Sequence, residues 1–402
     1  MEKETFKEYI LMYFMTYGTI ITEVFYTLRK DRKYVSKVLC SLEKEGLISE
    51  NKIAVTDRHK KYYIRYKSIT VKGVEYVRTH YATRHKWLGF LPSPVPKFTM
   101  TTTKNYNMLG RNLKSISAAI IFNQANVDVH NGATKSYYEG KSVNFFDMID
   151  TAKNNYKIYC GYSLPENNTC KGVYFHSKDV ASYFKLSDSD VAQNKFHQHI
   201  GVLILENSSY FVYAAKPNGL KLNAESILRS KIYGERLFDT VKNNEGMRGH
   251  LKSAFVFTYT KKEFVKNFNA LVKSKDVIEK VLSSVMLFPV RYESEWFIKY
   301  LIKCEYQIHG ALEDALMKKM PDLNYGLSAN PYSYESGFRL LYRGKPAVNG
   351  MLFDPIKLQY FYEEAVKNKE REYVLICQDW QKEYYEAVMP ENVRYVLVGG
   401  NI

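Results

Sequence analysis

Residues 41–76, SLEKEGLISENKIAVTDRHKKYYIRYKSITVKGVEY, decide the fold of the N-terminal part of the chain. The stretch begins inside an amphipathic helix that Gly46 can end. Apolar residues then alternate over 53–55 and again over 62–66, and a polar, basic segment separates the two runs, which is typical of a β-hairpin. From Lys72 the spacing returns to that of a helix. We therefore predict a helix, a hairpin with a basic tip and a short closing helix.

Three amphipathic helices are predicted up to Gly46. Apolar residues recur at helical spacing over 6–17, where Gly18 can end the first helix, and a shorter pattern over 21–28 predicts the second. Asp31 can cap the third helix, whose apolar stripe consists of Val35, Val38, Leu39 and Leu42.

Three short helices followed by a basic hairpin resemble the winged helix-turn-helix of bacterial DNA-binding proteins, above all in SLEKEGLI at 41–48 and YKSITVKGVEY at 66–76. In such modules the third helix enters the major groove, and the hairpin contacts phosphate or the minor groove. The resemblance implies that the following residues face double-stranded DNA: Arg32, Lys33, Ser36, Lys37, Arg58, His59, Lys60 and Lys61. Winged helices also bind proteins, and lysines on a helix surface are commonly only solvated, so this alternative stays open.

The net charge of +16 is concentrated near the N-terminus. Residues 1–104 hold 20 basic and 10 acidic side chains, which is +10 within a quarter of the chain. Such asymmetry indicates a module that binds a polyanion, joined to a more nearly balanced body. An AT-rich genome would also produce a lysine-rich chain with 35 tyrosines, so charge alone does not decide for nucleic acid.

A chain of 402 residues is too long for one compact core. Periodicity is lost over 85–105, where Pro92, Pro94 and Pro96 prevent a continuous helix. We expect a winged helix DNA-binding domain over 1–84, a Pro-rich linker over 85–105, an α/β domain over 106–275 and a second α/β domain or lobe over 276–402.

The body alternates β-rich runs with helical patterns, so the predicted fold class is α/β or α+β, with a mixed α/β body after the winged helix. Continuous apolar runs suit strands that are covered on both faces. Strands are expected at 156–162, 172–175, 199–205, 210–214, 254–258, 285–290, 373–377 and 393–398. Helices are expected at 109–120, 178–185, 224–238, 261–272, 276–284, 293–303, 356–367 and 380–388. A faint echo between 201–271 and 338–388 allows two similar lobes.

Composition excludes several classes of protein. Hydrophobic residues make up 46% and charged residues 25%, which is an ordinary globular balance. No apolar run approaches 18 residues, and the first residues mix both charges, unlike a signal peptide. We therefore expect a cytoplasmic protein with no membrane partner. The five cysteines show no disulfide or zinc spacing, so no metal or other cofactor is expected.

Signals for catalysis are weak, and the motifs of P-loop ATPases, dinucleotide enzymes, zinc proteases and α/β-hydrolases are absent from the sequence. His197 and His199 could hold one metal ion on a strand face, as in rolling-circle nickases, but the polar Gln198 favours a surface or edge-strand histidine pair. A restriction-nuclease-like centre needs an acid, then an acid and a lysine on the next strand. Asp354 and Asp379 have that order without the lysine, and helix caps or turns explain them more simply.

Aromatic and basic residues alternate in YYIRY at 62–66. Such a pattern could stack the bases of a nucleic acid. Alternating aromatics in a hairpin more commonly form the core and cross-strand pairs, which is the interpretation we expect here.

A second resemblance covers both the predicted winged helix and the body. It lies in ITVKG at 69–73, in GVL at 201–203 with YFVY at 210–213, and in a following helix with Glu225 and Arg229. In these features the chain resembles the replication-relaxation proteins of bacterial plasmids and integrative elements. The resemblance implies a role in plasmid replication initiation or mobilisation through repeated sites in an origin, and it supplies no catalytic residues.

The expected partner is therefore double-stranded DNA, with a body that can assemble as a homo-oligomer. Two alternatives stay open, because the residues do not exclude them. One is a transcriptional regulator whose α/β domain senses a ligand. The other is a metal-dependent DNA nickase.

Overall fold

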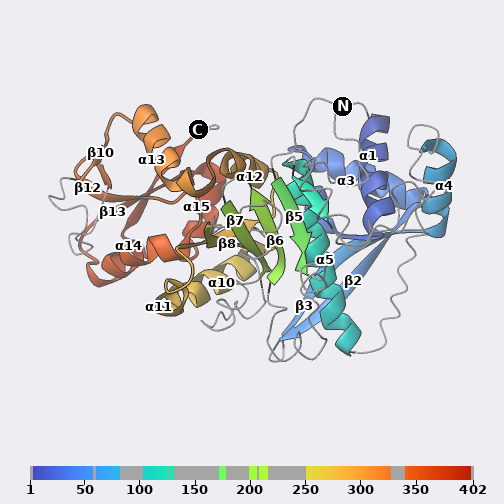
Figure 1. Ribbon diagram of the computed structural model, residues 1–402, viewed down its shortest axis with the longest axis horizontal. Helices are drawn as coiled ribbons and strands as arrows, with labels where there is room; N and C mark the ends of the chain where they lie inside the picture. Colours follow the sequence, from blue (N-terminus) through green and yellow to red (C-terminus); the bar gives the residue numbers. More distant parts are fainter. Residues whose placement is uncertain are drawn as a thin grey trace, which may run out of the picture.

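The computed structural model shows a mixed α+β protein whose strands form three sheets (Figure 1). This confirms the predicted class in its α+β form. The structure describes residues 3–57, 60–81, 103–125, 127–130, 172–177, 199–205, 208–215, 250–326 and 340–399. The expected linker over 85–105 lies almost wholly outside these residues, as do the strand expected at 156–162 and the helices expected at 178–185 and 224–238.

Residues 3–81, called the N-terminal unit below, combine helices with a three-stranded antiparallel sheet in the order β1-β3-β2. The elements in chain order are α1 (Lys3–Tyr17), β1 (Thr19–Ile21), α2 (Thr22–Phe25), α3 (Arg32–Lys44), β2 (Ile48–Asp57), β3 (Lys60–Ile69) and α4 (Val71–Tyr81). The third helix, the hairpin and the closing helix were predicted. The second helix is shorter than the predicted 21–28, because Ile21 is the last residue of β1 and the chain turns after Phe25.

The helix α3 has the start and stop signals that its sequence indicates. The Asp31 side chain accepts a hydrogen bond from the Tyr34 backbone N–H at 3.0 Å and so caps the helix. At the other end Gly46 has a φ of 71°, in the left-handed region that favours glycine. The backbone N–H of Leu47 donates to the carbonyl of Leu42, which closes the helix in a Schellman arrangement.

The segment ITVKG fastens α4 to the turn between α3 and β2. The Thr70 hydroxyl donates to the carbonyl of Gly46 at 2.7 Å and accepts from the backbone N–H of Gly73 at 3.0 Å. Lys72 Nζ donates to the carbonyl of Glu45 at 2.8 Å, at the negative end of α3. These hydrogen bonds give the quoted motif a structural role that does not depend on any ligand.

The body contains a six-stranded and a five-stranded sheet within the described residues. The first sheet consists of β4 (Asp128–His130), β5 (Gly172–His176), β6 (His199–Leu205), β7 (Ser208–Ala214), β8 (His250–Thr258) and β9 (Ser284–Pro289). The second consists of β10 (Leu323–Tyr325), β11 (Leu340–Tyr342), β12 (Lys345–Asn349), β13 (Tyr373–Gln378) and β14 (Val393–Val398). The strands β6, β9 and β13 are buried along their whole length, as their continuous apolar sequences predicted.

The two body sheets share one pairing pattern. From β5 to β9 the first two pairings are antiparallel and the last two are parallel. From β10 to β14 the same directions recur in the same order. The echo predicted between 201–271 and 338–388 is therefore found in the topology of the sheets.

Helices surround the two body sheets. They are α5 (Thr103–Gln124), α10 (Lys261–Lys273), α11 (Lys275–Ile278), α12 (Glu293–Cys304), the 3-10 turn η4 (Glu305–Gln307), α13 (Ile308–Lys319), α14 (Pro355–Lys367) and α15 (Asp379–Tyr385). The helix predicted at 276–284 was wrong in its second half, because β9 already begins at Ser284. Helix α13 and the short strands β10 to β12 were not predicted.

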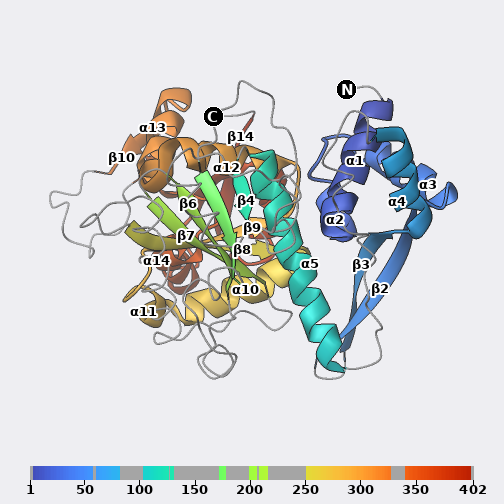
Figure 2. The same cartoon turned by 45° about the vertical axis from the view of Figure 1, so that its right-hand side comes forward.

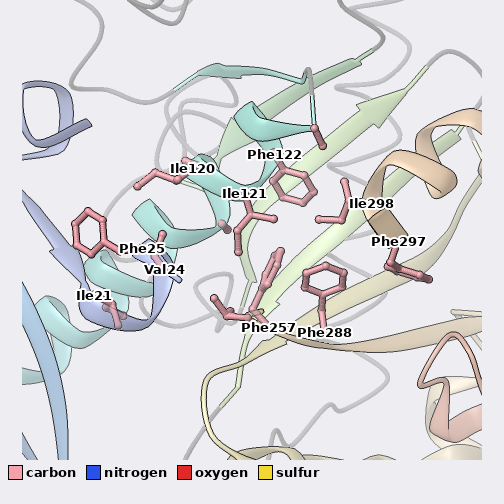
Figure 3. Close-up of a cluster of buried hydrophobic side chains, with 14 of the residues drawn as sticks. Ile21, Val24, Phe25, Ile120, Ile121, Phe122, Phe257, Phe288, Phe297 and Ile298 are labelled. Carbon is pink, nitrogen blue, oxygen red and sulfur yellow. The ribbon is translucent and has the colours of Figure 1, made fainter. Parts of the chain in front are cut away.

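The N-terminal unit packs on the body through α5, which carries apolar side chains on both sides (Figures 2 and 3). On one side Ile21, Val24 and Phe25 lie against α5, and on the other side Phe122 faces the aromatic side chains of the first sheet, in one continuous buried cluster. The Thr27 hydroxyl also donates to Gln124 Oε1 at 3.2 Å. The N-terminal unit is therefore joined to the body by a shared core.

Candidate nucleic-acid interface

The outward face of α3 presents a row of exposed, mainly basic side chains. Lys33, Lys37, Cys40 and Lys44 are all exposed and follow one another at spacings of four, three and four residues. Residues at such spacings lie on one side of a helix. The opposite side buries the predicted stripe of Val35, Val38, Leu39 and Leu42. The lysines predicted to face DNA are therefore brought together on one solvent-facing surface.

The amino-terminal end of α3 is held by aromatic side chains. The guanidinium of Arg32 is exposed and lies 5.7 Å from the centre of the Tyr26 ring. The Tyr26 hydroxyl shares a hydrogen bond of 3.3 Å with Ser36, which is half-buried. Ser36 thus supports the turn before α3 more than it faces solvent, whereas Arg32 stays accessible.

Two basic side chains of this turn, Arg29 and Lys30, were missed by the sequence analysis. Arg29 lies 4.2 Å from the centre of the Tyr34 ring, where it braces the turn. Lys30 is exposed beside the amino-terminal end of α3, where its charge adds to that of Arg32 and Lys33. The run Lys30-Asp31 indicated only a helix break, so the position of Lys30 on the basic surface could not be predicted from spacing.

The basic hairpin tip is only partly described. Arg58 and His59 lie outside the described residues, and Lys60 and Lys61 belong to β3 by their backbone while their side chains are not described. Further along the hairpin, Lys52 and Arg65 are exposed and face each other across the two strands.

Acidic side chains near this surface are paired with lysines other than those of the α3 row. Lys67 is buried and lies 2.5 Å from Glu43 and 2.9 Å from Glu50, while Lys7 lies 2.6 Å from Glu45. Burial alone would lower the pKa of Lys67, but the hydrogen bonds to Glu43 and Glu50 outweigh burial and raise it. These carboxylates are therefore neutralised internally, and the charge of the α3 row is left for an external partner.

The histidine expected on a surface or edge strand is instead buried. His199 is 1% exposed in β6, an interior strand between β5 and β7, next to the rings of Phe211 and Tyr213. The expectation was wrong because both faces of β6 are covered by the body. Its predicted partners His197 and Gln198 lie outside the described residues.

The carboxylate considered for a nuclease centre is a helix cap. Asp354 is 2% exposed and accepts hydrogen bonds from the backbone N–H groups of Ile356 at 3.0 Å and Lys357 at 3.2 Å. It also accepts one from the Ser284 hydroxyl. Burial lowers the pKa of the neighbouring His309. The cap interpretation is therefore confirmed, and Asp354 also joins the start of α14 to β9 of the first sheet.

The described part of the chain offers little for metal or ligand chemistry. No three His, Cys, Asp or Glu side chains gather there as ligands for a metal ion would. Asp379 is exposed in the first turn of α15, away from any such group. A hollow between elements of the two body sheets, lined by Trp296, Trp380 and Gln381 among others, has a volume of about 10 Å³. It holds about one water molecule, far below the ~300 to 1,000 Å³ of a ligand pocket.

No protein-family model, curated protein or solved structure matches the chain. The site is therefore interpreted from its own geometry. Within the described ranges, no helix combines the length and the apolar character that crossing a lipid bilayer requires.

Proposed function

We propose that the chain is a sequence-specific double-stranded DNA-binding protein of a mobile genetic element, which acts in plasmid replication initiation or mobilisation. The single observation that carries the proposal is the exposed row on α3. A helix with its side chains is about 10 to 12 Å wide and the major groove of B-DNA is about 12 Å wide, so such a row can meet base edges and phosphates together.

The order of elements in the N-terminal unit supports the same proposal. A short strand after α1, two helices, a long hairpin and a sheet ordered β1-β3-β2 are the arrangement expected of a winged helix-turn-helix. In this assignment α3 is the recognition helix and the β2–β3 hairpin is the wing. Glu43, Glu45 and Glu50 near the row are already paired with Lys67 and Lys7, so a polyanion would meet less opposing charge there.

The mobile-element role rests on the resemblance to replication-relaxation proteins. It places the chain in the cytoplasm, where plasmid DNA lies, and makes the body a non-catalytic scaffold that holds copies of the chain on repeated sites. The nickase alternative finds less support, because His199 is buried.

The proposal is tested by selecting binding sites from a random duplex library with the full chain. The selected duplex is then titrated against wild type and the double variant Lys33→Ala/Lys37→Ala. We expect binding to weaken by about 1 to 3 kcal/mol for each lysine that touches a base, or the salt slope to fall by about one for each phosphate that the variant no longer neutralises. The matched control is Lys280→Ala/Lys369→Ala, two exposed lysines of the body. Equal affinity of wild type and the α3 variant contradicts the proposal.

Cys40 gives an independent readout at the same surface. It is exposed on the α3 row, whereas Cys377 is buried and burial raises its pKa to about 12. Alkylation followed by peptide mass spectrometry should modify Cys40 and spare Cys377. The selected duplex should slow alkylation of Cys40 several-fold, and an unchanged rate with bound DNA would place the DNA on another surface.

A further inference from the structure

The β2–β3 hairpin exposes one aromatic ring to solvent. Tyr63 is 62% exposed, the largest value among the large apolar side chains of the described residues. Ile64 and Tyr66 lie on the opposite face of the strand, where Ile64 is half-buried and Tyr66 is only 6% exposed. The alternating aromatics therefore have two roles: Tyr66 belongs to the core, as predicted, and Tyr63 does not.

The register of the hairpin explains why the Tyr63 ring stays uncovered. Its cross-strand neighbour is Ala54, whose single methyl group cannot pair with the ring. The expected cross-strand pairing of aromatics is therefore not made at this position. An exposed tyrosine with no packing partner contributes little to the stability of the hairpin.

Two cations lie next to the ring on the same face, both on its side toward α3. Arg65 follows Tyr63 by two residues and so points to the same side of the strand, and Lys52 lies directly opposite Arg65. Both are exposed, and neither makes an ion pair within the described part of the chain. We call Lys52, Ala54, Tyr63 and Arg65 the hairpin platform.

The charges of Lys52 and Arg65 act on one acid, Glu50, whose ion-pair partner is Lys67. Glu50 is on the same face, one pair closer to α3, and its carboxylate lies 2.9 Å from Lys67. The hydrogen bond from Lys67 holds the pKa of Glu50 below its usual value, so Glu50 stays ionised and paired. The platform therefore presents an aromatic face with two positive charges.

We propose that the hairpin platform binds an unpaired DNA base. The Tyr63 ring stacks on the base, and Lys52 and Arg65 contact the backbone phosphates on the α3 side of it. A stacked base with its adjoining phosphates matches one aromatic ring beside two cations, whereas a protein partner would bury a wider apolar patch. The inference rests on the proposed function, because α3 would hold the adjoining duplex while the platform holds a base that has left the stack.

The test uses the full chain and two DNA probes of the selected sequence. One probe is a fully paired duplex, and the other has a short mismatched bubble beside the site, with 2-aminopurine in the bubble. Tyr63→Ala should weaken binding to the bubble probe by about fivefold to 150-fold and abolish the quenching of 2-aminopurine that stacking causes. Its affinity for the paired duplex should not change. Tyr63→Phe should behave as wild type, because it retains the ring.

The control is Tyr325→Ala, which removes another exposed tyrosine from an edge strand of the body. It should leave binding to both probes unchanged. The two proposals fail separately. If Lys33→Ala/Lys37→Ala leaves duplex affinity intact, the α3 assignment is wrong. If Tyr63→Ala binds and quenches the bubble probe like wild type, or if Tyr63→Phe is as weak as Tyr63→Ala, stacking at the platform is overturned.

Discussion

Gly73 lies directly against the backbone of Leu47: a β-carbon added at Gly73 would stand 2.1 Å from the Leu47 carbonyl oxygen. Real β-carbons do not approach a backbone oxygen this closely. The close approach is between α4 and the turn that follows α3, two elements that the Thr70 hydroxyl also joins. The glycine of the ITVKG segment is therefore required by packing, independent of any ligand.

Gly73→Ala should destabilise the N-terminal unit. Because the added methyl group meets the Leu47 backbone, which cannot move aside as a flexible side chain can, we expect the free energy of unfolding to fall by about 3 kcal/mol, at the upper end of overpacking substitutions. Denaturant unfolding followed by far-UV circular dichroism measures it. The matched control is Gly310→Ala in α13, where a β-carbon would meet nothing within 4 Å. That change should be neutral or stabilise by up to about 1 kcal/mol, and equal effects of the two substitutions would refute the close approach.

The shared core at α5 predicts that damage in the N-terminal unit is felt in the body. Phe25 is buried in the cluster that contains Ile120, Ile121 and Phe122 (Figure 3). Phe25→Ala should cost about 3 to 5 kcal/mol, and the cavity should loosen the carboxyl-terminal half of α5. Hydrogen exchange followed by mass spectrometry should show faster exchange at 113–124.

Peptides from α14 serve as the reference in the same experiment, because its buried side chains Ile356, Leu358, Phe361 and Ala365 lie in the second core cluster. They should exchange as in wild type. If Phe25→Ala left the exchange of 113–124 unchanged, the N-terminal unit would be an independent module that merely touches α5.

Elements with local signals were predicted well from the sequence. The limits of α3 follow from Asp31 and Gly46, and the strands β6, β13 and β14 follow from continuous or alternating apolar runs. The missed elements depend on distant partners. Strand β1 has three residues and forms only because Thr19 to Ile21 meet residues 66–68 of β3. Strands β10 to β12 are equally short and depend on pairing with one another and with β13.

The candidate site shows the same division between local and distant information. Helical spacing placed Lys33 and Lys37 on one face correctly, because the spacing and the apolar stripe fix the outward side of α3. In YYIRY the period of two shows that Tyr62, Ile64 and Tyr66 share a face, but not which face is buried. Only the packing of the sheet on the unit decides that Tyr66 is inside and Tyr63 outside.

The buried carboxylate of Glu23, where the N-terminal unit meets the body, predicts that the stability of the protein depends on pH. Glu23 of α2 has a buried oxygen, Oε2, that accepts no hydrogen bond within the described residues. Burial raises the pKa of Glu23, and the negative charges of Glu263 from α10 and Glu50 from β2 raise it further. A hydrogen bond from the backbone of Glu23 and the charge of Arg65 from β3 oppose the rise without cancelling it. Lys114 of α5 does not relieve it, because its ammonium group already binds Glu263 and the carbonyl of Ala215.

The sign of the effect follows from the raised pKa. The folded protein holds the proton of Glu23 more tightly than the unfolded chain does, so stability is greatest at low pH and falls as the pH rises above about 4.5 through the folded-state pKa. Glu23→Gln mimics the protonated form. It should therefore raise the melting temperature at pH 7 to 8, and this gain should shrink as the pH is lowered toward 4.5.

Differential scanning fluorimetry across this pH range measures the gain. The control is Glu279→Gln, which removes an exposed carboxylate from the end of α11 and should give a difference that does not depend on pH in this way. Because the charge of Glu263 from the body acts on Glu23, a gain at pH 7 would support an unfavourable negative charge of Glu23 next to the body. If the Glu23→Gln variant melts at or below the wild-type temperature at pH 7, the negative charge of Glu23 is balanced in solution and the prediction is wrong.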